Sequence, residues 1–223
     1  MPLVPSRVVP LSGLRKITAA RMRESVARTA QLTLHREVDA GPMLAHRERH
    51  PERPSITAYL VRALALALRE HPRLNSRIAG DAVEEFDEVN LAVAVAVPEG
   101  LVAPVLRRAA EVRLLEAHHA LRDLAERARA KRLTLRDFED ATASLTNLGT
   151  YGVDGFTPLL NPPQSAILGV GRICDTVALD GGAVRPRSAL ALSLTFDHQV
   201  EDGAGAASLL QEVARRLGTP ADL

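Results

Sequence analysis

The sequence is poor in the residues that carry redox chemistry and base stacking. It has a single cysteine, Cys174, and no tryptophan, and aromatic residues make up 3% of its 223 positions. One cysteine excludes an internal disulfide framework, and so few aromatic side chains provide no stacking platform for nucleic-acid bases. No stretch approaches the ~20 uninterrupted apolar residues of a membrane span, and no N-terminal segment has the order of a signal peptide. We therefore expect a cytoplasmic protein that contacts neither a membrane nor nucleic acid.

The sequence also lacks an excess of charge of either sign. Its 28 Lys and Arg residues balance 27 Asp and Glu residues, for a net charge of +1, so there is no positive field to attract nucleic acid. A hydrophobic content of 46% over this length is enough for one large core. Prolines and alternating Val and Leu favour an extended arm at the N-terminus. We expect an arm over residues 1–12 and one domain over residues 13–223.

Periodic patterns predict alternating helices and strands. Amphipathic or apolar runs predict helices near residues 12–28, 55–70, 112–131 and 204–217. The first of these helices has Leu14, Ile17, Met22 and Val26 as its apolar side. Alternating residues predict strands near 31–38, 91–97, 101–106, 143–148, 165–170, 173–179 and 190–196, with a hairpin turn at Gly80-Asp81. The class is therefore α/β with a large mixed sheet.

Most candidates for chemistry fail on their context. His46 and His50 are four residues apart, but no carboxylate or cysteine completes a ligand set, so we expect no metal. The run Gly169-Val170-Gly171 is followed by a strand-like segment, which excludes a dinucleotide fingerprint. Cys174 lies in a strand-like segment without an adjacent base. His118 and His119 fit surface or boundary positions of their helix.

The stretch Asp197–Gly203 is the remaining candidate. It follows the alternating run that ends at Phe196 and precedes an amphipathic helix, so His198 falls where a strand stops and Asp202 where a helix begins. An imidazole titrates near neutral pH and can transfer protons. The alternative is a buried core histidine beside an ordinary aspartate helix cap.

Five ordered segments resemble one known family. They are Pro10–Lys16, Val89–Pro104, Ser144–Gly149, Phe156–Gly169 and Asp197–Gly203. In this order they resemble the catalytic domain of dihydrolipoyl acyltransferases of 2-oxo acid dehydrogenase complexes, and the match covers essentially the whole chain. The resemblance implies a two-layer α/β sandwich like that of chloramphenicol acetyltransferase. It also implies a homotrimer whose active site lies between subunits and receives coenzyme A and dihydrolipoamide from opposite ends.

The resemblance assigns a role to four residues. His198 would be the general base that takes the proton from a thiol, and Thr146 of the adjacent subunit would donate a hydrogen bond to the tetrahedral oxyanion. Asp202 would form an ion pair with Arg15 that holds the His198 loop. A general base is worth about 10²- to 10⁴-fold and an oxyanion donor about 10²- to 10³-fold in rate. The alternative for Thr146 is a β-branched residue that merely suits its strand.

The chain departs from the family pattern at two positions. Gln199 stands where the family usually has arginine, and Ala143 stands where it has an aromatic residue. Gln199 leaves open an acyltransferase that uses a small alcohol or amine acceptor. The other alternative is a core protein that only organises partner enzymes, and the retained His198 argues against it. The resemblance further implies a lipoyl group carried on a separate domain or protein, and association with the other components of such a complex.

Overall fold

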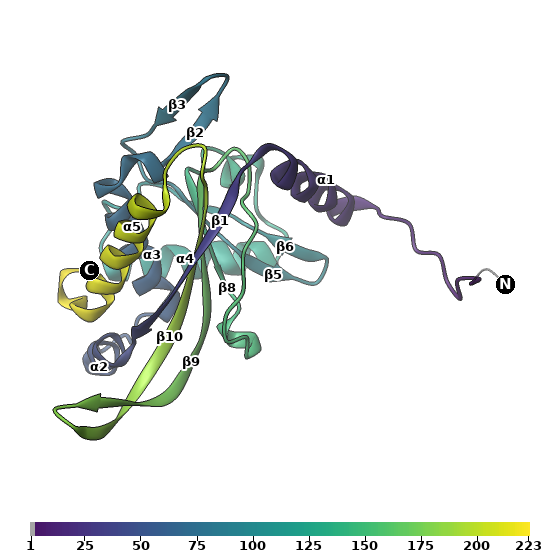
Figure 1. Cartoon of the computed structure of the whole chain (residues 1–223). Helices are drawn as coiled ribbons and strands as arrows, with labels where there is room; N and C mark the ends of the chain where they lie inside the picture. The colour runs from purple at the N-terminus through teal and green to yellow at the C-terminus, as the bar shows by residue number, and fades with distance from the viewer. Residues whose placement is uncertain (1–2) are drawn as a thin grey trace.

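The computed structural model describes residues 3–223, and its centre is a mixed six-stranded sheet (Figure 1). The strand order is β1-β10-β9-β8-β4-β7, in which β8 runs parallel to both β4 and β9 while the other pairs are antiparallel. The strands are β1 (Gln31–Asp39), β4 (Leu91–Val93), β7 (Val105–Leu106), β8 (Ala143–Asn147), β9 (Ala166–Asp180) and β10 (Ala183–Asp197). The predicted α/β class with a large mixed sheet is confirmed.

Three helices pack on one side of this sheet and share its hydrophobic core. They are α3 (Ile56–Glu70), α4 (Leu114–Arg129) and α5 (Gly203–Gly218). Ser55 begins α3 as predicted, because its hydroxyl accepts a hydrogen bond from the amide of Ala58 at 3.2 Å. Every residue of α3 from Ala58 to Leu68 is buried, which explains why this helix is apolar almost all round. The helix lies between α4 and α5, with contacts to both.

The opposite face of the sheet is polar near its middle. Register places His35, Ser193, Gly169 and Thr146 in one row across β1, β10, β9 and β8. Within this row His35 Nδ1 lies 2.9 Å from Ser193 Oγ. A Cβ at Gly169 would lie 3.1 Å from the ring of Phe156, so the loop that crosses this face packs tightly against the strand there. Thr146 therefore lies on a polar face rather than in the apolar core.

Two hairpins and five shorter helices complete the fold. The hairpin of β2 (Ser76–Ala79) and β3 (Ala82–Glu85) turns at Gly80-Asp81, as predicted, and a second joins β5 (Val95–Val97) to β6 (Gly100–Val102). The expected single strand 91–97 is wrong, because the chain leaves the main sheet at Ala94 and β5 pairs only with β6. The short helices are α2 (Gly41–Arg49), η1 (Pro72–Leu74), η2 (Leu135–Phe138), η3 (Gly149–Tyr151) and η4 (Pro220–Asp222).

The N-terminal helix α1 (Gly13–Arg28) stands away from the sheet, and the extended segment before it projects further still (Figure 1). Ser25 is the one buried residue of α1. Two residues of the predicted apolar side are exposed, Ile17 at 57% and Val26 at 60%, whereas Leu14 and Met22 are half-buried. Ser12 precedes the helix but makes no side-chain cap bond. The first two residues of the predicted arm lie outside the described residues.

Two kinds of feature are missing from residues 3–223. No helix in that range combines the length and the apolar character required to cross a bilayer. Nor does that range bring three His, Cys, Asp or Glu side chains together around a possible metal position. Instead of facing a metal, His46 Nδ1 lies 2.8 Å from the hydroxyl of buried Tyr59.

Candidate active site

The predicted strand-to-helix turn is present between β10 and α5. β10 ends at Asp197, α5 begins at Gly203, and Asp202 is the N-cap residue. The Asp202 carboxylate accepts hydrogen bonds from the amides of Ala204 at 2.8 Å and Gly205 at 3.0 Å. These amide bonds, first that of Gly205, lower the pKa of Asp202 below its ordinary value. Asp202 thus caps the N-terminus of α5, one of the roles considered for it from the sequence.

His198 is exposed at this turn, so the alternative of a buried core histidine is wrong. Its backbone amide donates to the carbonyl of Ala30 at 2.9 Å, which extends the β1–β10 ladder by one bond. Its ring lies over the edge of the core, with its centroid 5.8 Å from that of Phe196. Neither ring nitrogen has a hydrogen-bond partner within the described part of the chain, so both remain available to a substrate or a second subunit.

The residue before His198 is held more tightly than the sequence suggested. Asp197 is 3% exposed. One carboxylate oxygen accepts hydrogen bonds from the amide of Ala30 at 3.1 Å and the amide of Gln199 at 3.1 Å. The side chain of Gln199 also donates to both oxygens, at 3.1 and 3.2 Å. A buried carboxylate with neutral donors only thus lies beneath the candidate base.

Thr146 lies at a different place, on β8, where it lines a cleft of about 620 Å³. The residue is half-buried, and its hydroxyl bonds to no other residue among positions 3–223. The cleft lies between β5, β6, η3 and one side of α4. Its polar lining includes Ser55, Thr57, His118, Arg122, Arg129, Asn147, Thr150 and Tyr151.

A single chain does not bring Thr146 and His198 together. Thr146 aligns with Gly169 on β9, and Gly169 aligns with Ser193 on β10. His198 follows Ser193 by five residues, which is about 17 Å along a strand, and two strand spacings add about 10 Å across the sheet. Because these two displacements are roughly perpendicular, Thr146 and His198 lie roughly 20 Å apart. A hydrogen bond or a shared substrate atom within one chain is excluded.

Arg15 and Asp202 are not paired within the chain either. Arg15 is exposed on α1, near the end that stands away from the sheet. The groups that shift the pKa of Asp202 are its own helix amides and His198, and Arg15 is not among them. Within residues 3–223 the carboxylate of Asp202 serves as a helix cap, and the ion pair with Arg15 stays a prediction for an assembled form.

His118 is a residue of the cleft whose place the sequence did not reveal. Its Nδ1 accepts a hydrogen bond from the amide of Ser55 at 3.3 Å. Burial, and next the neighbouring His119, lower the pKa of His118. Its spacing of four residues from Leu114 and three from Leu121 places it beside the buried stripe of α4, which indicated only a boundary position. The cleft depends on β5, β6 and η3, which are distant in sequence.

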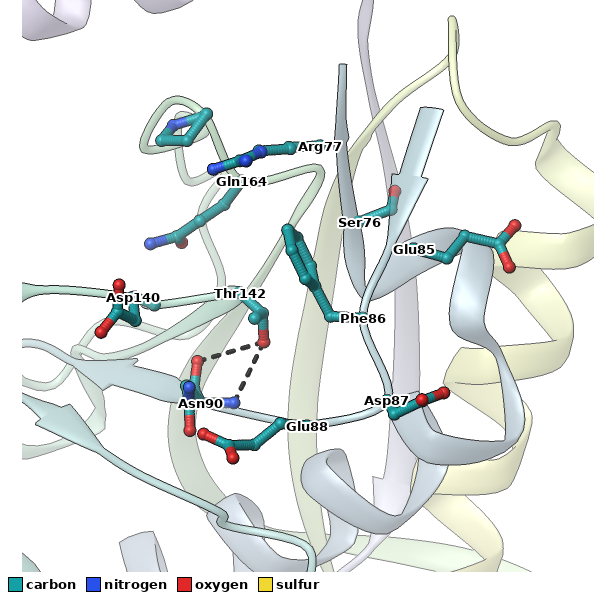
Figure 2. Close-up of a pocket in the computed structure, with 12 residues that line it drawn as sticks. Ser76, Arg77, Glu85, Phe86, Asp87, Glu88, Asn90, Asp140, Thr142 and Gln164 are labelled. Atoms are coloured by element: carbon teal, nitrogen blue, oxygen red, sulfur yellow. Dashed lines mark hydrogen bonds between the residues drawn. The ribbon is translucent and has the colours of Figure 1, made fainter. Parts of the chain in front are cut away.

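A second cavity, of about 380 Å³, holds none of the predicted site residues (Figure 2). It lies beside the β2–β3 hairpin and the start of β4. Thr142 lines it and exchanges hydrogen bonds with the backbone of Asn90, at 3.1 and 3.3 Å. Its carboxylates come from Glu85, Asp87, Glu88 and Asp140. This cavity therefore presents negative charge, unlike the Thr146 cleft with its arginines.

The fold is of a known type. A solved chloramphenicol acetyltransferase superposes with a TM-score of 0.57 at 15% identity, over 95% of this chain and 99% of that one. This likeness establishes the fold: a mixed sheet with helices, of the chloramphenicol acetyltransferase type. The chain belongs to the 2-oxoacid dehydrogenases acyltransferase (catalytic domain) family, whose model matches residues 4–223. The family predicted from the five ordered segments is confirmed.

Individual relatives agree with this membership. The chain is 40% identical to the dihydrolipoyllysine-residue acetyltransferase component of the acetoin cleaving system of Bacillus subtilis, over 96% of this chain and 56% of that protein. It is 34% identical to the succinyltransferase component of the 2-oxoglutarate dehydrogenase complex of Haemophilus influenzae, over 96% and 54%. The chain thus spans about half the length of these curated relatives.

Solved structures with higher similarity are also acetyltransferases. A dihydrolipoamide acetyltransferase (E2p) of Azotobacter vinelandii superposes with a TM-score of 0.93 at 29% identity, over 100% of this chain and 99% of that one. A probable dihydrolipoamide acetyltransferase of Listeria monocytogenes gives a TM-score of 0.92 at 28% identity, over 96% and 95%. The likeness to these proteins thus extends over all or nearly all of the chain.

Proposed function

We propose that this chain transfers an acyl group between dihydrolipoamide and coenzyme A, with His198 as general base. The observation that carries the proposal is the pair of unbonded groups described above. Within residues 3–223, an exposed imidazole at one end of the sheet has no hydrogen-bond partner, and a hydroxyl without a hydrogen bond lies in a cleft at another place. Two such groups are what thiol exchange between thioesters requires, namely a base and an oxyanion donor.

The distance between these groups supports an active site that lies between subunits. A base roughly 20 Å from its oxyanion donor is idle within one chain. In a cyclic homotrimer, His198 of each subunit would enter the Thr146 cleft of the next, because head-to-tail contacts repeat around a closed ring. The arrangement yields one complete site at each interface.

The transfer then proceeds in two balanced steps. His198 accepts the proton of the attacking thiol, and the thiolate adds to the thioester carbonyl to form a tetrahedral intermediate. Thr146 of the adjacent subunit donates a hydrogen bond to the oxyanion. When the carbon–sulfur bond of the original thioester breaks, the leaving thiolate takes the proton back from His198. The same groups serve both directions, because each direction begins with a thiol and ends with a thiol.

A relative supports the choice of residues by its spacing. The Azotobacter vinelandii structure was determined to investigate the catalytic roles of a serine, a histidine and an asparagine. That serine precedes that histidine by the same number of residues as Thr146 precedes His198, and the asparagine follows at the spacing of Asp202. Threonine keeps the hydroxyl of serine, and aspartate keeps the oxygen with which asparagine caps a helix.

The charge of the cleft suits coenzyme A. Arg122 and Arg129 both line it, and cations of this kind bind phosphate groups. Arg122 is 3.8 Å from Glu126, a weak ion pair, whereas Arg129 joins none of the ion pairs that α4 forms within residues 3–223.

The acyl donor would be a lipoyl group on a separate domain or protein, and the chain would act with the other components of a 2-oxo acid dehydrogenase complex. The chemistry requires no metal.

Mixed trimers test the proposal. A His198→Ala chain and a Thr146→Ala chain carry different tags, are expressed together, and are purified over both tags in sequence. Each variant alone should lose transfer from acetyl-CoA to dihydrolipoamide. A mixed trimer should regain activity, because one interface then joins an intact His198 to an intact Thr146.

The outcomes separate the parts of the proposal. Inactive mixed trimers would show that the two residues do not meet across an interface. Substantial activity in the His198→Ala homotrimer would show that His198 is not the base. A monomeric wild-type protein with full activity would contradict the intersubunit site.

A further inference from the structure

Gln199 connects the catalytic turn to the end of α1. Its side-chain amide donates to the carbonyl of Arg28 at 3.0 Å and to the two carboxylate oxygens of Asp197 at 3.1 and 3.2 Å. Arg28 is the last residue of α1, and the final carbonyls of a helix have no partner within it. Gln199 thus supplies one of the donors that this helix end lacks.

The same side chain closes a loop around His198. Asp197 and Gln199 flank His198 in the sequence, and the carboxylate of Asp197 also accepts from the backbone amide of Gln199 at 3.1 Å. Such a bond, from an amide two residues on to an aspartate side chain, is an Asx turn. With the side chains of both neighbours bonded to each other, the direction in which the imidazole leaves the backbone is fixed.

The hydrogen bonds of Gln199 matter because their acceptor, Asp197, is buried. It is 3% exposed, and its carboxylate takes part in no ion pair within the described residues. Its charge rests on three neutral donor groups: the amide of Ala30, the amide of Gln199 and the side chain of Gln199. Loss of the Gln199 side-chain donor would leave the buried carboxylate of Asp197 with fewer hydrogen bonds than it needs. The turn would then rearrange to recover them, because an unsatisfied buried charge is costly.

Few hydrogen bonds join α1 to the rest of residues 3–223, and Gln199 makes one of them. Elsewhere the helix is held through Ser25, whose hydroxyl donates to the carbonyl of Leu160 at 2.7 Å and accepts from Gln31 at 3.0 Å. These contacts all lie in the last turn of α1 or directly behind it. The rest of the helix is exposed or half-buried.

We propose that Gln199 is a positioning residue for the base: it locks Asp197 and the end of α1 together and so fixes the direction of the His198 imidazole. The inference rests on the proposed function of His198 and adds a residue to it. Gln199 does not touch the reacting atoms, and its effect reaches the reaction only through the orientation of its neighbour.

A change of one atom tests this role. In Gln199→Glu the donor group becomes a carboxylate oxygen that faces the Asp197 carboxylate and the Arg28 carbonyl, both of which repel it. We expect kcat for acyl transfer to fall about 10- to 100-fold while the KM for coenzyme A changes little, because a misdirected base slows the proton transfer and leaves substrate binding intact. Gln211→Glu makes the same chemical change at an exposed position of α5 and should leave kcat unchanged.

A second substitution should reverse the first. In the double variant Asp197→Asn with Gln199→Glu, the amide and the carboxylate exchange places, and the bond between the two side chains can form again. We expect a kcat several-fold above that of Gln199→Glu. A lost bond of merely structural value would instead show as a lower melting temperature with an unchanged kcat.

The results are read against His198→Ala in the same assay. An inactive His198→Ala together with a fully active Gln199→Glu overturns the positioning role alone, and so does a double variant without recovery. An active His198→Ala overturns the proposed function itself. Should Gln199→Glu fail to assemble, Gln199→Met keeps the length without a donor or a charge; a lowered kcat in the assembled variant supports the role, and an unchanged kcat overturns it.

Discussion

His198 and Ala30 are bound to each other through their backbones, since the amide of His198 donates to the carbonyl of Ala30 at 2.9 Å. The amide of Ala30 in turn donates to Asp197 at 3.1 Å, a partner 167 residues away in sequence. The position of the turn that carries His198 is thus fixed by backbone bonds and by Asp197, and none of these bonds involves the imidazole.

The first prediction follows from that separation between backbone and ring. His198→Ala removes the base but keeps the bonds of the turn, so the chain should fold and assemble normally. We expect transfer to fall at least about 10²- to 10⁴-fold. Activity with acetyl-CoA and dihydrolipoamide, measured beside light scattering and a thermal melt, checks both halves. Loss of assembly together with activity would show that the ring is a structural contact.

The hydroxyl of Thr146 should matter more than its shape. Thr146→Val keeps the β-branched form that suits β8 but removes the donor, and we expect about a 10²- to 10³-fold drop in kcat. Thr146→Ser keeps the donor and should retain most activity. Steady-state kinetics of the two variants decide between an oxyanion donor and a residue that only fits its strand. Equal kinetics for the two variants would show that Thr146 only fits its strand.

Asp202 offers a choice between its observed role and its predicted one. As a helix cap it can be replaced by asparagine, whereas Asp202→Ala leaves two amides of α5 without an acceptor and should lower the melting temperature by about 2–4 °C. If Arg15 also pairs with Asp202 in the assembled protein, Asp202→Asn and Arg15→Ala should each reduce activity, and the double variant should reduce it no further. Additive losses would count against the pair.

The pKa of Asp202 gives this residue a pH dependence of known sign. Bonds from the helix amides lower its pKa in the folded chain relative to the unfolded chain. The stabilisation it contributes is therefore present above the ordinary carboxyl pKa and is lost as the pH falls through the lowered value. Melting temperatures should drop less steeply with acid in Asp202→Asn than in the wild type.

His118 should make the fold sensitive to mild acid. Burial lowers its pKa, so the folded chain favours the neutral ring, which accepts the hydrogen bond from the Ser55 amide. As the pH falls below about 6.5 the unfolded chain binds the proton more readily, and stability decreases. His118→Gln should flatten melting temperature against pH between neutral and pH 5. An unchanged profile in His118→Gln would contradict this role.

Arg129 should affect binding more than turnover. Its guanidinium lines the Thr146 cleft, and Arg129→Ala removes a cation from the proposed path of coenzyme A. We expect the KM for coenzyme A to rise about 10-fold with little change in kcat, and the effect to shrink at high salt. Arg132→Ala makes the same loss of charge outside the cleft. An equal effect in both variants would point to general electrostatics.

Local patterns in the sequence were sufficient for several elements of the site. Alternation up to Phe196 and amphipathic periodicity after Asp202 predicted the strand, the turn and the helix around His198, because each depends on neighbours within one element. The Gly80-Asp81 turn and the buried helix α3 were predictable for the same reason. The roles of Thr146 and Arg15 came from resemblance, and no local pattern indicated them.

Features that depend on distant partners could not be predicted. The alternation of residues 91–97 continues unbroken through Ala94, yet the chain changes sheets there because β6 is available to β5. Nothing in the sequence around Asp197 and Gln199 indicates their hydrogen bonds, because the partners, Ala30 and Arg28, lie far away along the chain. Ile17 and Val26 belong to the predicted apolar side of α1, but within residues 3–223 they stay 57% and 60% exposed.

The distance between Thr146 and His198 gives the proposed enzyme a dependence on its own abundance. A single folded chain would hold His198 without the Thr146 of a neighbouring subunit. Dilution that separates subunits should therefore abolish acyl transfer without unfolding the chain. The rate per chain should then rise with total concentration until association is complete, and it should recover on reconcentration.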